Sequence, residues 1–181
     1  MLPKNKRDFP IMLDTPLAVG GMKVLQLTNP MQLAEEGVRM GNCVATYSAQ
    51  CATGNAYIFS IRDASGKSCA TIEYRLSRSA TGLPEFILIQ KKGFQNASPD
   101  TKCDEALHAL HRYTKSPESR HKMLTLVVYQ KASEFGGADM ANKYLRSLTF
   151  MKFLEKEAAG RINFEQLVTK AIEQEKIFQQ L

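Results

Sequence analysis

The sequence predicts an α+β fold in which a small antiparallel β-sheet of three or four strands packs against several helices, with a helical C-terminal third. Three observations carry this prediction: two strand-like runs flank a short turn, a capped proline opens a helix ahead of them, and residues 98–181 follow a helical pattern. With 181 residues and 44% hydrophobic content, the chain can bury one core but is short for two. We therefore expect a single domain over 1–181, with an extended lead-in at 1–21, a core at 22–97 and a helical part at 98–181.

The first predicted elements surround a capped helix. Residues 1–21 contain several prolines and little periodicity, so no regular structure is expected there. Residues 22–27 alternate enough to form a short strand. The triplet 28–30, Thr-Asn-Pro, is typical of a helix start, because a side-chain oxygen can cap the free amides and proline suits the first helical position. A helix is expected over 30–40, and a second short helical stretch over 42–54.

The next segment predicts an antiparallel hairpin. Residues 56–62 and 69–76 flank a turn-rich loop at 64–67. The predicted register stacks apolar residues on one face, pairing Tyr57 with Tyr74, Phe59 with Ile72 and Ile61 with Ala70. The opposite face then collects polar residues, namely Ser60, Arg62, Thr71, Glu73 and Arg75. Residues 86–89 are apolar at every position, so this third strand is expected to be covered on both faces.

The C-terminal third reads as helical. Residues 98–100, Ser-Pro-Asp, repeat the cap-and-proline pattern and predict a helix with three inward positions, Cys103, Leu107 and Leu110. The segment 122–135 fits a strand as well as a helix. After a glycine pair, a long helical pattern covers 138–159, and a final helix is expected from 163 towards 178.

The chain is basic, with a formal charge of +6 and a pI near 9.2. A basic surface favours anionic partners such as nucleic acid. Four candidate contacts are expected around one end of the sheet: Arg75, Arg78, Lys91 and Lys92. The alternative is that they are ordinary solvated residues, because lysines and arginines occur along the whole chain.

Several function classes find no support in the sequence. No stretch approaches the apolar length needed to cross a bilayer, and the N-terminus lacks a signal-peptide core, so we expect no membrane association and a cytoplasmic location. The four cysteines are scattered, which favours reduced thiols. His108 and His111 lie three residues apart but lack a second ligand pair at fixed spacing, so neither a metal site nor a cofactor is predicted.

A series of short motifs runs through residues 33–96. In chain order they are Glu36-Gly37, Cys43-Val44-x-x-Tyr47, the strand at 57–62, Thr71-Ile72-Glu73 and Gln90-x-x-Gly93-x-x-Asn96. This series resembles the PcfJ-like family, in which a histidine usually precedes the cysteine where this chain has Asn42. The resemblance implies an origin on plasmids, phages or other mobile elements, and it implies no settled biochemical activity.

Cys43 is the candidate nucleophile. It stands near a predicted helix start, where the helix dipole and free amides stabilise a thiolate. A small cysteine-dependent hydrolase or transferase would use Cys43, Glu73 and Gln90, inside a pocket that also includes Asn42, Tyr47, Arg62, Gly93 and Asn96. The structural alternatives are a small buried thiol at position 43 and an ordinary cross-strand ion pair at position 73.

Three functional hypotheses therefore stand side by side. One is a mobile-element accessory protein that binds nucleic acid through its basic surface. A second is the enzyme that uses Cys43. A third is a non-catalytic interaction module that self-associates, or binds protein partners, through its C-terminal helices.

Overall fold

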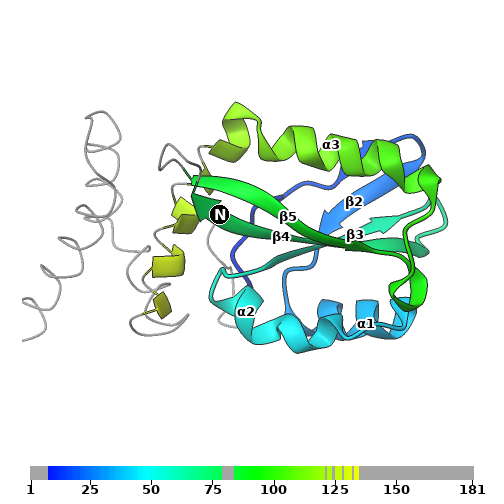
Figure 1. Cartoon of the computed structure of the whole chain (residues 1–181), viewed down its shortest axis with the longest axis horizontal. Coiled ribbons are helices and arrows are strands. Elements are labelled where there is room, and N and C mark those ends of the chain that lie inside the picture. Colours follow the sequence, from blue (N-terminus) through cyan, green and yellow to red (C-terminus); the bar gives the residue numbers. More distant parts are fainter. Residues whose placement is uncertain are drawn as a thin grey trace, which may run out of the picture.

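The molecule has three layers, with a β-sheet between two layers of helices (Figure 1). A computed structural model describes residues 8–78, 84–120, 122–123, 125–127, 129–131 and 133–134, and every statement on the fold refers to these. The sheet is antiparallel and has five strands in the order β1-β2-β3-β4-β5. Helices α1 and α2 cover one face and α3 covers the other (Figure 1). The predicted α+β class is therefore confirmed.

Short connections link the described helices and strands. The strands are β1 (Leu17–Val19), β2 (Met22–Gln26), β3 (Tyr57–Arg62), β4 (Ser68–Arg78) and β5 (Pro84–Lys92). The α-helices are α1 (Pro30–Met40), α2 (Ser48–Ala52) and α3 (Asp104–Thr114), and the 3-10 helices are η1 (Val44–Tyr47), η2 (Phe94–Asn96) and η3 (Thr101–Cys103). None of the described helices is long and apolar enough to span a membrane.

Helix α1 begins and ends where the sequence predicted. The Asn29 side chain accepts a hydrogen bond from the Gln32 amide at 3.0 Å, and Pro30 occupies the first turn. The helix ends at Gly41, whose φ of 61° is the left-handed conformation of a C-cap. Its buried side chains include Leu33, Glu36 and Met40.

The sheet has more strands than the three or four predicted. Residues 1–21 were expected to lack regular structure, yet β1 pairs with β2 through a tight turn at Gly20 and Gly21, both at positive φ. Two consecutive positive φ values suit a two-residue hairpin turn, which glycine adopts readily. A three-residue strand is too short to show alternation, which is why the pattern missed it.

The predicted β3–β4 register is confirmed at all three pairs, Tyr57 with Tyr74, Phe59 with Ile72 and Ile61 with Ala70. These side chains face α3 and form the larger core with its buried residues Ala106, Leu107 and Leu110. The opposite face does carry the predicted polar residues, but α1 and η1 cover it. Ser60, Thr71 and Glu73 are therefore buried.

Strand β5 departs from its prediction. Because β5 pairs with β4 and lies at the end of the strand order, it forms one edge of the sheet. Ile87, Leu88 and Ile89 are exposed, so the expectation that helices or strands cover both faces is wrong. A continuous apolar run is typical of a fully buried strand, and the pattern alone does not distinguish it from an apolar edge strand.

The C-terminal predictions are tested only in part. Leu107 and Leu110 in α3 and Cys103 in the preceding η3 are buried as expected. The capping side chain is that of Asp100, which caps η3, and not that of Ser98. Within 117–134, all positions that the structure describes are helical, so the strand alternative for this segment is wrong. The predicted glycine break, the helix over 138–159, the final helix and self-association through them lie outside the described residues.

Candidate functional site

A pocket of about 80 Å³ opens between η1 and the α1-covered face of the sheet. Its walls come from three separate parts of the chain: the connection that leads from α1 into η1, the strands β3 to β5, and the end of η2. The lining residues are Asn42, Cys43, Val44, Tyr47, Ile58, Thr71, Glu73, Gln90, Lys92 and Asn96. We call this site the η1 pocket.

The end of α1 positions the first wall. The amide of Asn42 donates to the Gly37 carbonyl at 3.1 Å, and the Asn42 Oδ1 accepts from the Val44 amide at 3.1 Å. A side chain at position 37 would meet the Asn42 carbonyl at 3.1 Å, so glycine allows this close approach. The chain therefore turns sharply and presents Cys43 and Tyr47 beside the sheet.

Glu73 forms the floor of the η1 pocket. Its carboxylate is only 2% exposed and accepts from the Gln90 Nε2 at 2.8 Å and from the Arg75 Nε at 2.7 Å. The Gln90 Nε2 also lies 3.0 Å from the Tyr47 hydroxyl oxygen and donates to it. Glu73 and Gln90 are directly opposite each other on β4 and β5, next to a β-bulge. Glu73 does pair with an arginine, but the partner is Arg75 on the same strand, so the pair is not the cross-strand ion pair that was expected.

The buried carboxylate of Glu73 helps to raise the pKa of two neighbouring side chains, Tyr47 and Cys51. Burial, followed by the negative charge of Glu73, raises the pKa of the Tyr47 hydroxyl. The same two causes raise the pKa of Cys51 to about 12. Tyr47 therefore stays protonated at neutral pH.

Cys43 is the exposed thiol of the site. Because its side chain is exposed, it is not the buried packing thiol that was the structural alternative. Cys51 has that role, at 1% exposure in the core between α1 and the sheet. Cys103 is also buried, and burial raises its pKa to about 11.

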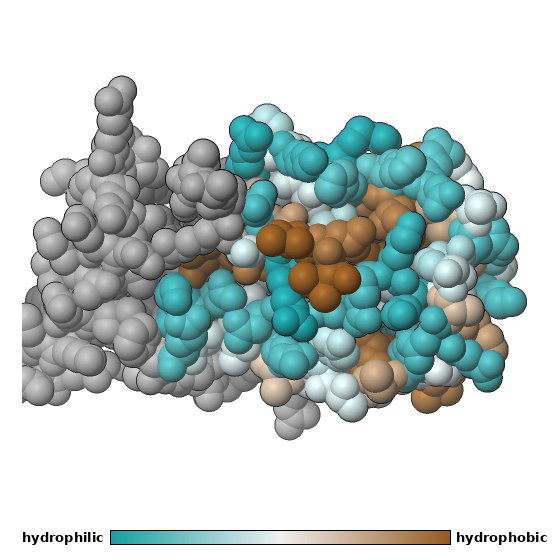
Figure 2. Space-filling view, viewed as in Figure 1, coloured by the Kyte–Doolittle hydropathy of each residue, from teal (hydrophilic) through white to brown (hydrophobic). Residues whose placement is uncertain are grey.

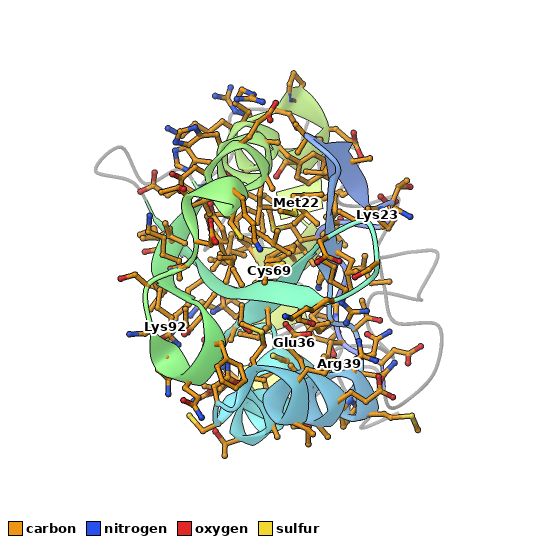
Figure 3. The ribbon with its side chains drawn as sticks, turned by 90° about the vertical axis from the view of Figure 1, so that its right-hand side faces the viewer. Met22, Lys23, Glu36, Arg39, Cys69 and Lys92 are labelled. Carbon is orange, nitrogen blue, oxygen red and sulfur yellow. The ribbon has the colours of Figure 1, made fainter. Side chains whose placement is uncertain are left out.

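A second polar network lies directly beside the η1 pocket. Glu36, a fully buried residue of α1, accepts from the Ser68 hydroxyl at 2.9 Å and from the Thr71 hydroxyl at 3.2 Å. Its Oε2 also lies 3.4 Å from the Arg62 Nη2, so Arg62 belongs to this network and does not line the pocket. Thr71 joins the two networks, because its Oγ1 accepts from the Asn42 Nδ2 at 3.4 Å. Figure 3 shows Glu36 between α1 and the sheet.

Sequence reasoning missed Glu36 and Thr71 as parts of the site. The signal for Glu36 was present, since it precedes Gly37 in the first motif of the series. Thr71 was placed on the polar face of the hairpin, and its position next to Glu73 was the available signal.

Of the two predicted residues Gly93 and Asn96, only Asn96 lines the η1 pocket. Gly93 does not line the pocket; a Cβ there would meet the Ser98 carbonyl oxygen at 2.9 Å, so glycine permits tight packing of the loop. Asn96 does line it and has a φ of 63°, as does the neighbouring Gln95 at 49°. The backbone is therefore left-handed at Asn96 but not at Gly93, whose φ is −82°.

The four predicted nucleic-acid contacts do not gather at one end of the sheet. Lys91 and Lys92 pair with Ile72 and Thr71, whereas Arg78 pairs with Pro84 at the other end of the same hairpin. Arg75 lies between them and binds Glu73. Lys92 alone of the four lines the η1 pocket, and Figure 3 shows it at the β5 edge.

The described residues contain no group of three histidine, cysteine or acidic side chains that could hold a metal ion. His108 and His111 are exposed on α3, which covers the other face of the sheet. The His111 Nδ1 lies 3.4 Å from the Tyr74 hydroxyl. These two histidines therefore do not contribute to the η1 pocket.

The polar atoms of the η1 pocket suit an anionic or amide-bearing group. Lys92 provides a cation at the wall, and Asn42 and Asn96 provide amide donors. The charge of Glu73 is offset by Arg75 and buried, so it contributes little negative charge at the opening. The exposed thiol of Cys43 lines the same pocket.

Comparison with known proteins gives one positive result. A family model described as PcfJ-like protein matches residues 4–107, which is more than half of the chain and includes every residue of the η1 pocket. No curated protein and no solved structure matches the chain.

Proposed function

The chain belongs to the PcfJ-like family, and we propose that it is an accessory protein of a plasmid or phage that binds nucleic acid at the η1 pocket. The observation that carries the proposal is the position of Lys92, a basic residue that lines the same pocket as the side chains of Asn42 and Asn96. A lysine and amide donors together suit a phosphate group, which accepts hydrogen bonds and carries negative charge.

The charges around the opening support this proposal. Lys92 makes no ion pair with any residue that the structure describes, whereas the guanidinium groups of Arg62 and Arg75 are engaged by Glu36 and Glu73. Lys91 is exposed next to it on β5. A phosphate group at the opening would therefore meet Lys92, with Lys91 beside it, and neither lysine has an ion-pair partner among the described residues of its own chain.

The test is binding of labelled single-stranded and duplex oligonucleotides across a salt series. Replacing Lys91 and Lys92 together by alanine should weaken binding at low salt. It should also reduce the slope of log affinity against log salt by about 0.9 for each lost duplex phosphate contact.

The matched control is the double change Lys67→Ala and Lys115→Ala. Both control lysines are exposed and neither lines the pocket, and the control removes the same number of charges. Equal losses of affinity in the two double variants would mean that net charge alone drives binding, which contradicts a site at the η1 pocket.

A cysteine-dependent hydrolase or transferase is the second candidate function. It is favoured by one observation: the exposed Cys43 thiol opens onto the pocket, beside Tyr47 and Glu73, while Cys51 and Cys103 are buried. Access alone predicts that Cys43 reacts with iodoacetamide before the buried thiols.

The enzyme hypothesis requires that the Cys43 thiol be intrinsically reactive as well as accessible to solvent. Cys43 should be alkylated faster than Cys69, which is partly exposed, and this advantage should persist when the pH is lowered below neutral. Glu73→Gln should change the alkylation rate of Cys43 and leave that of Cys69 unaltered. A Cys43 rate equal to that of a free cysteine peptide, in both proteins, would contradict nucleophilic catalysis.

A further inference from the structure

The β5 edge of the sheet has the features of an interface. β5 is nine residues long and pairs with β4 on one side only among the described strands. The other side of an edge strand presents unpaired amide and carbonyl groups that can pair with another strand. Figure 1 looks onto this edge, with β5 in front of β4.

The centre of β5 is apolar and exposed. Ile87, Leu88 and Ile89 are 39%, 36% and 46% exposed, and they follow one another on the strand. Figure 2 shows their hydrophobic surface gathered over β5 and bordered by hydrophilic residues. Proteins usually protect a long edge strand with charges, and here the charges stand at its two ends instead of its centre.

The end charges of β5 are opposite in sign. Glu85 lies near the start of the strand, and Lys91 and Lys92 lie at its end, with Leu88 midway. Antiparallel pairing of β5 with a second β5 about Leu88 brings the acidic end of each strand beside the basic end of the other. Parallel pairing would instead align like charges, which is destabilising.

From this arrangement we propose that the chain forms a two-fold homodimer through antiparallel β5–β5 pairing. The interface is isologous, since each copy contributes the same patch. Leu88 of one copy faces Leu88 of the other near the axis, and Glu85 reaches Lys91 or Lys92 of the other copy. The two sheets then join into one continuous sheet, and the exposed apolar residues become buried between copies.

The bulge in β5 is compatible with this pairing. Ile89 is the extra residue, since Glu73 pairs with Gln90 and Tyr74 with Leu88. A bulge shifts the register by one residue beyond it. This shift moves the partner of Glu85 from Lys91 to Lys92, and both are cations.

The first measurement is the mass of the full chain by sedimentation equilibrium across a micromolar concentration series. The wild type should be a dimer, and Leu88→Asp should raise its dissociation constant by roughly tenfold or more, because two carboxylates would face each other at the axis. Leu88 is already partly exposed, so the variant monomer should keep its circular dichroism spectrum. A wild-type monomer at all concentrations would overturn the proposal and leave the edge for a strand of another protein.

A charge swap tests the antiparallel sense. Glu85→Lys and Lys92→Glu should each weaken the dimer, and the two changes combined should restore part of the lost affinity. Lys67→Glu, on the exposed β3–β4 turn, is the control for the charge change and should leave the dimer intact. Failure of the combined variant to recover would contradict the predicted apposition of strand ends.

Disulfide trapping tests the position of the axis. In a Cys43→Ser background, two copies of Leu88→Cys would bring their Cα atoms to about 4.5–5.5 Å, a separation that a disulfide spans. Mild oxidation should give a covalent dimer, and the control Lys67→Cys should give none. A stable dimer that resists Leu88→Asp and is not trapped at position 88 would place the interface on another surface and overturn the proposal.

Discussion

Glu36 shows how a single buried carboxylate holds the site together. It is fully buried, and three side chains from β3 and β4 approach it, those of Arg62, Ser68 and Thr71. A buried carboxylate without hydrogen-bond donors would be strongly unfavourable, so these donors are what allow it to remain there. Because Thr71 also binds Asn42, the carboxylate fixes the wall of the η1 pocket as well as the position of α1.

Replacing Glu36 by glutamine should therefore destabilise the fold. The amide group of glutamine would face hydroxyl donors, and Arg62 would lose its ion-pair partner, so we expect a loss of about 2 kcal/mol in the free energy of unfolding. Urea denaturation followed by circular dichroism measures this directly.

The neighbouring Glu35 provides the control. Glu35 is 52% exposed and forms an i,i+4 ion pair with Arg39 at 3.7 Å, so Glu35→Gln should change stability by about 0.5 kcal/mol or less. Similar losses in the two variants would show that the Glu36 network is not a structural centre.

At the scale of elements, the features that depend on sequence neighbours alone were predicted correctly. The hairpin of β3 and β4 was predictable in its register because alternation and a turn segment both act within a few residues. The start of α1 was predictable for the same reason, since a cap and a proline are local features. β1 was missed because three residues carry no period, and the exposure of β5 was misjudged because strand order is not encoded locally.

An ion pair between two distant segments makes the stability of the fold depend on pH. Lys122, in the helical segment, bonds Asp14 ahead of β1 at 2.8 Å and Glu118 at 2.9 Å. The hydrogen bond from Lys122 is the main reason that the pKa of Asp14 is lowered from its ordinary value of 3.8. A lowered folded-state pKa contributes stability that is present above pH 3.8 and is lost as the pH falls through the folded value.

Asp14→Asn should therefore reduce stability at neutral pH and have a smaller effect in acid. Because Asp14 is partly exposed, we expect a difference of less than about 1 kcal/mol at pH 7. Urea denaturation of the wild type and the variant, at neutral pH and near pH 3, measures the difference in stability at each pH. A deficit of the variant that is the same at both pH values would mean that the charge of Asp14 is not its cause.

For the whole molecule, the site was predictable as a set of residues but not as an arrangement. Six residues of the predicted site share the η1 pocket: Asn42, Cys43, Tyr47, Glu73, Gln90 and Asn96. What each of them does in a reaction or a complex stays a prediction. Arg62 and Gly93 lie beside the pocket and not in it, because Glu36 engages one and the Ser98 carbonyl packs against the other. Such long-range partners depend on how α1 and the loop after β5 fold back on the sheet.

The proposed dimer and the proposed nucleic-acid site have a joint geometric consequence. A two-fold axis that relates antiparallel edge strands is perpendicular to the sheet, so the α1-covered face of both copies points to the same side. The two η1 pockets then open on one side of a continuous sheet, each with Gln90 and Lys92 from the paired strands. A single nucleic acid of sufficient length can reach both pockets, which raises its affinity without any new contact.

We therefore expect affinity to depend on length only in the dimer. Oligonucleotides of increasing length should show a rise in affinity for the wild type once one strand reaches both pockets. The monomeric Leu88→Asp variant should bind short oligonucleotides as the wild type does, because position 88 does not line the pocket, and it should lack the rise. Anisotropy titrations at constant salt measure both curves. Equal length dependence in the two proteins would contradict binding across the dimer, while loss of short-oligonucleotide binding on Lys92→Ala would still support the single pocket.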